Sequence, residues 1–153
     1  MISKNINILL ADDDKDDCML FKKALEELEL PTKLTTVSDG EQLMKLLNHN
    51  EEHFFNVLFL DLNMPRKNGF ICLEEIKCNA KLKSLPVIIF STSYDVAIAD
   101  KLYKNGAQHY ICKPVDFLHL KNTIRQAITF IINNKDNFSE ASQTPNDNYL
   151  ISQ

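Results

Sequence analysis

The chain has 153 residues, of which 44% are hydrophobic, and this length and composition are typical of one domain with a single core. Its formal net charge of −4 disfavours a nucleic-acid-binding protein, which normally carries a basic face. No apolar stretch approaches the roughly 20 residues that a membrane span needs, and the cysteines form no C-x-x-C pair. We therefore expect a cytoplasmic protein with free thiols that binds neither nucleic acid nor a membrane.

Short apolar runs punctuate the chain and predict five β-strands. Two of them, Val57–Leu60 and Val87–Phe90, contain almost no polar residue, as expected of strands that are buried on both faces of a parallel sheet. The other expected strands are Ile6–Ala11, Leu34–Val37 and His109–Cys112.

Amphipathic segments with helical spacing lie between and after these runs. In the first, the apolar positions are Leu20, Phe21, Ala24, Leu25 and Leu28. The later helices are expected from about Asp39, which is a candidate N-cap, after Gly69, over Tyr94–Lys104, and after Pro114 with Asp116 as a candidate cap. Five successive βα units predict an α/β fold with helices on both faces of a five-stranded parallel sheet. The common solution is flavodoxin-like and doubly wound, with strand order 2-1-3-4-5.

The composition changes near Asn133, where Asn, Ser, Gln and Asp become frequent. We interpret residues 1–132 as one domain and residues 133–153 as a polar, flexible C-terminal tail. The tail leaves no room for an output domain, so we expect a stand-alone module.

Polar residues follow four of the expected strands, where a doubly wound fold places its ligand site. These features are Asp12-Asp13-Asp14, Asp61 to Pro65, Ser91-Thr92-Ser93 and Lys113-Pro114. Two unit charges about 4 Å apart repel by roughly 4 kcal/mol at an effective dielectric of 20, so three clustered carboxylates need a cation. Carboxylate and carbonyl oxygens favour Mg²⁺. A carboxylate nucleophile, Mg²⁺, a lysine and a hydroxyl together suit the transfer of a phosphoryl group.

Four segments, in this order, resemble the response regulator receiver domain of bacterial two-component systems, the CheY-like superfamily. They are ILLADDD, LFLDLNMPRKNG, VIIFSTS and GAQHYICKP, and the resemblance extends over about residues 5–132. It implies that Asp61 is the phosphoacceptor. It also implies that Asp13 coordinates Mg²⁺ directly, that Asp12 acts largely through a bound water, and that the backbone carbonyl of Asn63 is a further ligand.

The same resemblance assigns the residues around the phosphoryl group. Ser91 and Lys113 would each bind one phosphoryl oxygen, and Tyr110 would be the aromatic switch that turns inward as Ser91 moves. Asn63 and Ser93 occupy the positions that tune phosphoryl lifetime. The Lys113–Pro114 peptide bond is expected to be cis. Asp14 is expected to cap the first helix rather than bind the metal.

The resemblance further implies partners for this module. The upstream donor would be a histidine kinase or a histidine phosphotransfer protein. Downstream, the face formed by the fourth helix, fifth strand and fifth helix would bind a target protein or another copy of the chain as a homodimer. On this interpretation the protein is not an enzyme beyond its own phosphorylation and dephosphorylation.

Three alternatives remain at this stage. A degenerate receiver would act as a phosphorylation-independent binding module. An aspartyl-nucleophile phosphohydrolase of the haloacid-dehalogenase type needs a general acid two residues after Asp61, where this chain has Asn63. A mononucleotide-binding module would need a glycine-rich loop after the first strand, where the chain instead has three aspartates.

Overall fold

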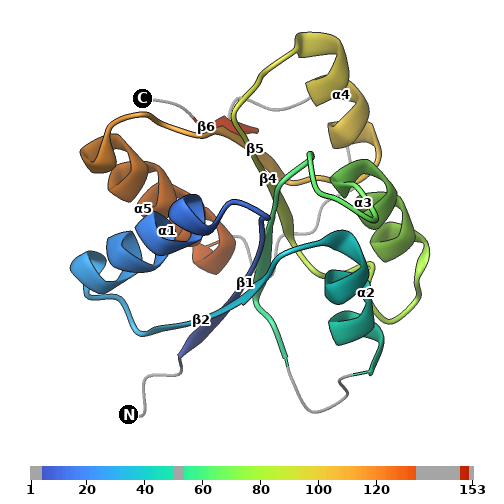
Figure 1. Ribbon diagram of the computed structural model, residues 1–153, viewed down its shortest axis with the longest axis horizontal. Coiled ribbons are helices and arrows are strands. Elements are labelled where there is room, and N and C mark those ends of the chain that lie inside the picture. The colour runs from blue at the N-terminus through green and yellow to red at the C-terminus, as the bar shows by residue number, and fades with distance from the viewer. Residues whose placement is uncertain (1–4, 50–53, 134–148, 152–153) are drawn as a thin grey trace.

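The computed structural model describes residues 5–49, 54–133 and 149–151, which fold around one parallel sheet (Figure 1). The strands are β1 (Ile6–Ala11), β2 (Thr32–Val37), β3 (Val57–Leu60), β4 (Val87–Ser91), β5 (His109–Cys112) and β6 (Leu150–Ile151). The helices are α1 (Lys15–Leu28), α2 (Gly40–His49), α3 (Gly69–Cys78), α4 (Val96–Lys104) and α5 (Phe117–Asn133). None of the helices in these ranges is long and apolar enough to cross a bilayer.

The strand order is β2-β1-β3-β4-β5-β6, and all neighbouring strands run parallel. The expected order 2-1-3-4-5 is therefore confirmed, with one strand added at the β5 edge. Figure 1 shows α1 and α5 on one face of the sheet and α2, α3 and α4 on the other. This arrangement explains why β3 and β4 are buried along their whole length.

Capping side chains fix where several helices begin. Asp14 accepts hydrogen bonds from the backbone N–H groups of Asp16 and Asp17, at 2.9 and 3.1 Å, so it caps α1 as expected. Asp95 accepts from Ile98 N–H, which explains why α4 begins at Val96 instead of Tyr94. The buried face of α1 contains four of the five expected residues, and Leu20 is the exception because it lies on the exposed side.

The core beneath α1 and α5 is organised around three phenylalanines. Phe21 of α1 packs edge-on against Phe59 of β3 and Phe90 of β4, with ring centroids 4.9 and 5.6 Å apart. The three rings are fully or almost fully buried. Edge-to-face pairs of this kind add about 0.5–1.5 kcal/mol each beyond the burial of apolar area. The packing therefore holds α1 firmly against the two central strands.

The sheet has six strands and not the expected five, because residues near the C-terminus form β6. Tyr110 of β5 donates its backbone N–H to the carbonyl of Tyr149, at 2.7 Å, and Ile111 is in register with Ile151. Tyr149 and Ile151 are 3% and 2% exposed. The expected flexible tail at 133–153 is thus wrong for residues 149–151, where two buried side chains stabilise the strand; residues 134–148 and 152–153 lie outside the described residues.

Candidate functional site

Backbone hydrogen bonds that extend the sheet place three charged residues beside one another. Asp61 N–H donates to Ala11 O at 2.9 Å, and Asp12 N–H donates to Val37 O at 3.0 Å. Lys113 N–H donates to Ser91 O at 2.7 Å. Each of the three follows directly after a strand, so the sheet itself fixes their main-chain positions.

The expected carboxylates meet at this end of the sheet. One oxygen from each of Asp12, Asp13 and Asp61 lies within 4.8 Å of the others. Asp12 and Asp61 are 1% and 5% exposed, whereas Asp13 is exposed. Asp12 also accepts a hydrogen bond from Asp14 N–H at 3.0 Å, which orients its carboxylate. We call these three residues and Lys113 the acidic site.

Lys113 is surrounded by carboxylates. Its ammonium nitrogen lies 2.7 Å from Asp12 Oδ2, 2.8 Å from Asp17 Oδ2 and 3.8 Å from Asp61 Oδ2. The lysine side chain is 9% exposed, so these interactions are poorly screened by water. The Lys113 ammonium therefore interacts most strongly with Asp12 and Asp17 and most weakly with Asp61.

The pKa values in the acidic site follow from burial and from these interactions. Burial raises the pKa of Asp61 to about 7, and the Asp12 charge adds to the rise while Lys113 opposes it. Burial also raises the pKa of Asp12. For Lys113 burial acts the other way, but hydrogen bonds to Asp12 and Asp17 raise its pKa above the ordinary lysine value. The site thus contains more negative charge than its own lysine neutralises.

This donor set fits a hard divalent cation. Asp12 Oδ2 is fully buried, and the Lys113 ammonium lies 2.7 Å from it. A buried carboxylate oxygen beside two further carboxylates is the oxygen-rich environment that Mg²⁺ takes up in proteins. A hollow of about 460 Å³ opens beside Asp12 and Asp13, between α1 and β2, and gives access from that side.

Ser91 and Tyr110 lie on neighbouring strands, where Ser91 is in register with Cys112 and Tyr110 with Ile89. Ser91 ends β4, is fully buried and accepts a hydrogen bond from Ser93 N–H at 3.4 Å. Tyr110 is 1% exposed, and its hydroxyl donates to the backbone carbonyl of Ser93. Tyr94 packs edge-on against the Tyr110 ring, with centroids 5.2 Å apart. The backbone that follows Ser91 is therefore linked directly to the expected switch residue.

The Lys113–Pro114 peptide bond is trans, because none of the peptide bonds in the described ranges is cis. The expectation of a cis bond is wrong for this structure. For a peptide bond before proline the trans form is favoured by about 0.5–1 kcal/mol, so a cis bond needs specific support from its surroundings. Here the trans chain already brings Lys113 into hydrogen-bonding distance of Asp17.

The loop between β3 and α3 carries Asp61 and Asn63, and close contacts hold it in place. Asn63 is exposed and its N–H donates to the Asp61 carboxylate, which lowers the pKa of Asp61 against the effect of burial. A Cβ atom on Gly69 would lie 2.4 Å from the carbonyl oxygen of Asp61, so only glycine allows this approach. The carbonyl of Asn63 as a metal ligand stays a prediction.

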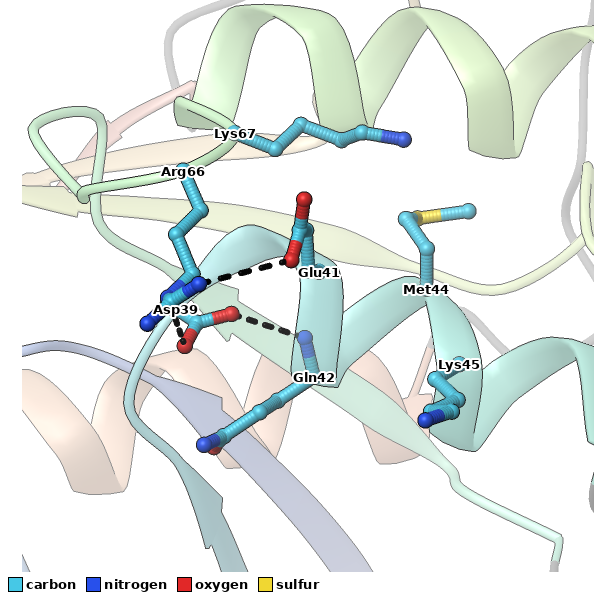
Figure 2. Close-up of a pocket in the computed structure, with 7 residues that line it drawn as sticks. All are labelled: Asp39, Glu41, Gln42, Met44, Lys45, Arg66 and Lys67. Atoms are coloured by element: carbon cyan, nitrogen blue, oxygen red, sulfur yellow. Dashed lines mark hydrogen bonds and ion pairs between the residues drawn. The ribbon is translucent and has the colours of Figure 1, made fainter.

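Ion pairs to α2 anchor the other side of this loop. Figure 2 shows Arg66 reaching over the start of α2, with its guanidinium 3.6 Å from Asp39 and 3.9 Å from Glu41. Asp39 also accepts a hydrogen bond from Gln42 N–H at 2.8 Å, which caps α2 as expected. These residues line a hollow of about 450 Å³, in which Arg66 pairs with Asp39 and Glu41. The ion pairs connect the loop to α2, and the lining of the hollow does not include Asp12, Asp13 or Asp61.

The sequence reasoning missed two residues that the structure brings to prominence. Asp17 lies in the first turn of α1, and its carboxylate lies 2.8 Å from the Lys113 ammonium in the acidic site. Tyr149 falls in the segment expected to be a polar tail, yet its ring lies against Tyr110 with centroids 6.5 Å apart. Neither residue had a specific signal in the sequence, because Asp17 is one of several aspartates around the start of α1 and Tyr149 is an isolated tyrosine among polar residues.

The chain is similar to known response regulators. The family model described as the response regulator receiver domain matches residues 8–125. A probable chemotaxis protein CheY from Rhizobium etli is 28% identical over 123 residues, which is 80% of this chain and 92% of the relative.

Two solved structures are also similar. The phosphorylated cyanobacterial phytochrome response regulator RcpA matches with a TM-score of 0.78 and 29% identity, covering 86% of this chain and 96% of that one. The Mn²⁺-bound form of response regulator Rcp1 matches with a TM-score of 0.69 and 27% identity, covering 92% and 99%.

Proposed function

The chain belongs to the response regulator receiver domain family, and we propose that it accepts a phosphoryl group on Asp61 in a Mg²⁺-dependent reaction. One observation carries this proposal. The Asp61 carboxylate lies within 4.8 Å of two other carboxylates that can hold a cation, and 3.8 Å from a buried lysine. A nucleophile, a metal site and a fixed positive charge are the parts that phosphoryl transfer requires.

In the proposed reaction an oxygen of Asp61 attacks the phosphorus atom of the donor. The bond from phosphorus to the donor's leaving group breaks, its electron pair stays on the leaving group, and an acyl phosphate forms on Asp61. The nucleophile must be ionised, although burial raises the pKa of Asp61 to about 7. Bound Mg²⁺ would offset the negative charge of the carboxylates and of the incoming phosphoryl oxygens.

The remaining assignments rest on position in the fold. Asp13, Asp12 and the backbone carbonyl of Asn63 would hold Mg²⁺, and the similar structure of response regulator Rcp1, solved in its Mn²⁺-bound form, supports a divalent cation. Lys113 and the Ser91 hydroxyl would bind phosphoryl oxygens, because Lys113 lies 3.8 Å from Asp61 and Ser91 ends β4, the strand that pairs with β3. Asn63 and Ser93 would set how long the phosphoryl group persists.

Response regulators are signalling proteins, and we propose that this one signals by binding another protein when phosphorylated. Ser91 and Tyr110 connect the acidic site to the face formed by α4, β5 and α5, because the backbone after Ser91 accepts the Tyr110 hydroxyl. Movement of Ser91 toward a phosphoryl oxygen would shift this pair between two arrangements and change that face. The phosphoryl donor would be a histidine kinase or a histidine phosphotransfer protein.

Intact-mass spectrometry after incubation with acetyl phosphate tests the proposal. The wild type should gain one phosphoryl group with Mg²⁺ and none with EDTA, and Asp61→Asn should gain none. Asp39→Asn is the matched control, because Asp39 is also a buried aspartate but pairs with Arg66 away from the acidic site.

No phosphoryl gain from acetyl phosphate or from a phosphorylated histidine phosphotransfer protein would contradict the proposal. It would then favour a degenerate receiver that binds its partner without phosphorylation. Phosphate retained on Asp61→Asn would show that another residue is the acceptor.

A further inference from the structure

The Lys113 ammonium lies near two carboxylates from different parts of the chain. Asp61 Oδ2 is 3.8 Å away, and Asp17 Oδ2 of α1 is 2.8 Å away. The contact with Asp17 is a hydrogen bond between residues 96 positions apart in the chain. The Lys113 ammonium is thus closer to Asp17 of α1 than to the proposed phosphoacceptor.

Asp17 is held in place for this contact by the start of its own helix. Its backbone N–H donates to the Asp14 cap at 3.1 Å, and the edge-on packing of Phe21 fixes α1 against the sheet. The Asp17 side chain is 29% exposed, compared with 9% for Lys113. The pair is therefore partly shielded from water and stronger than a fully exposed ion pair.

Other contacts limit where the lysine can go. Its ammonium nitrogen lies 5.2 Å from the ring centroid of Phe90, which closes one side, and 2.7 Å from Asp12. Asp12 lies beside Asp61 in the acidic site, so the lysine can keep its contact with Asp12 while it moves toward Asp61. The contact with Asp17 is the one that opposes this movement.

We propose that Asp17 is a positioning residue that retains the Lys113 ammonium beside α1 and thereby weakens the binding of a phosphoryl group at Asp61. This inference rests on the proposed function, because it concerns the group that Asp61 would carry. A phosphoryl oxygen on Asp61 must compete with the Asp17 carboxylate for one lysine. Removing the Asp17 charge leaves the lysine free to pair with the phosphoryl group.

The chain offers a closely matched control. Asp16 precedes Asp17 in the first turn of α1, carries the same charge and is exposed. Asp16→Asn therefore reproduces the change in net charge and in the interaction with the helix dipole. Asp17→Asn differs from it in the loss of the Lys113 contact.

The test measures binding of beryllofluoride, a tetrahedral phosphoryl analogue, to the full chain in saturating Mg²⁺ by ¹⁹F NMR. Asp17→Asn should bind it about three- to tenfold more tightly than Asp16→Asn, the range expected for a partly shielded ion pair. Asp17→Glu keeps the charge and should remain within about twofold of the wild type. Mg²⁺ affinity should be equal in the two Asn variants. A general disturbance of the acidic site by Asp17→Asn would instead change its Mg²⁺ affinity.

The outcomes separate this inference from the proposed function. Wild-type protein that binds no beryllofluoride would overturn both. Wild-type binding that disappears in Asp61→Asn, with Asp17→Asn no tighter than Asp16→Asn, would overturn the role of Asp17 alone. Weaker binding by Asp17→Asn would show that Asp17 presents Lys113 to the phosphoryl group instead of retaining it.

Discussion

Two regions around β5 differ in the kind of side chain that they contain. At its carboxyl end, Lys113 faces the buried carboxylates of the acidic site. Along its outer edge lies a tyrosine cluster, which consists of Tyr94, Tyr103, Tyr110 and Tyr149. The first region is held together by charge balance and the second by ring packing and backbone hydrogen bonds.

This difference determines what each region responds to. The stability of the acidic site should depend on pH, because burial raises the pKa of Asp12 and Asp61, and on Mg²⁺ if the proposed metal binds there. In the tyrosine cluster, burial raises the pKa of Tyr149 above the ordinary tyrosine value, so the ring stays neutral at physiological pH. The change in unfolding free energy caused by a substitution should therefore depend on pH and Mg²⁺ in the acidic site and not in the tyrosine cluster.

The largest effect is expected for Lys113→Ala in EDTA at pH 8. The variant leaves Asp12 and Asp61 buried without their cation, and breaking a buried pair in this way costs about 3–5 kcal/mol of unfolding free energy. Lys67→Ala is the control, because Lys67 forms an ion pair of 2.8 Å with Glu75 at a more exposed position. Urea denaturation should show a loss of less than about 1 kcal/mol there. Equal losses would mean that burial does not set the strength of these pairs.

Tyr149→Ala should come next and should be insensitive to Mg²⁺. Tyr149 is 3% exposed and packs against both Tyr110 and Tyr103, so truncation removes a buried aromatic ring at a cost of about 3 kcal/mol. Tyr94→Ala, in which the lost ring is 41% exposed, should cost about 1 kcal/mol or less. Thermal unfolding with and without Mg²⁺ measures both variants. A Mg²⁺-dependent loss in Tyr149→Ala would show that the two regions are energetically coupled.

Asp61→Asn should increase stability in EDTA, with a pH dependence that identifies its cause. The folded-state pKa of about 7 lies above the ordinary value of 3.8, so the protonated form stabilises the fold below pH 4. This contribution is lost as pH rises through 7. Because asparagine never ionises, the variant should gain a few kcal/mol over wild type at pH 8 and almost nothing near pH 4. Urea denaturation between pH 4 and pH 8 measures the gain in unfolding free energy. A gain that did not change with pH would contradict its assignment to the ionisation of Asp61.

Tyr149→Phe should give the smallest effect. It keeps the ring and removes the hydroxyl that donates to the carbonyl of Ala99 at 2.7 Å. The expected loss is about 1 kcal/mol, the usual net contribution of one hydrogen bond. Urea denaturation at pH 7 measures it. A loss equal to that of Tyr149→Ala would assign the stability to the hydroxyl and not to the ring.

Sequence patterns predicted the central strands and the acidic site because both depend on local order along the chain. The bounds of β1, β3 and β5 agree with expectation, and β4 is one residue longer. Asp12, Asp13 and Asp61 meet because each directly follows a strand, or lies one residue beyond, at the same end of a parallel sheet. The expected cap residues Asp14 and Asp39 also bond the helix starts that they precede.

Features that depend on distant contacts were not predicted. The hydrogen bond from Lys113 to Asp17 joins residues 96 positions apart, and no periodicity specifies which carboxylate the lysine selects. β6 is only two residues long and depends on Tyr149 and Ile151 finding buried positions against β5.

The shortness of β6 has a consequence for how the protein behaves at high concentration. An open edge strand offers unpaired backbone groups on which another chain can add a strand, and very short edge strands are one way in which proteins prevent such aggregation. Leu150–Ile151 pairs with Tyr110 and Ile111 of β5 and itself presents only two residues to a neighbour. A protein that ended at Asn133 would leave Tyr110 and Ile111 unpaired on that side, and it should associate edge to edge more readily than the longer chain.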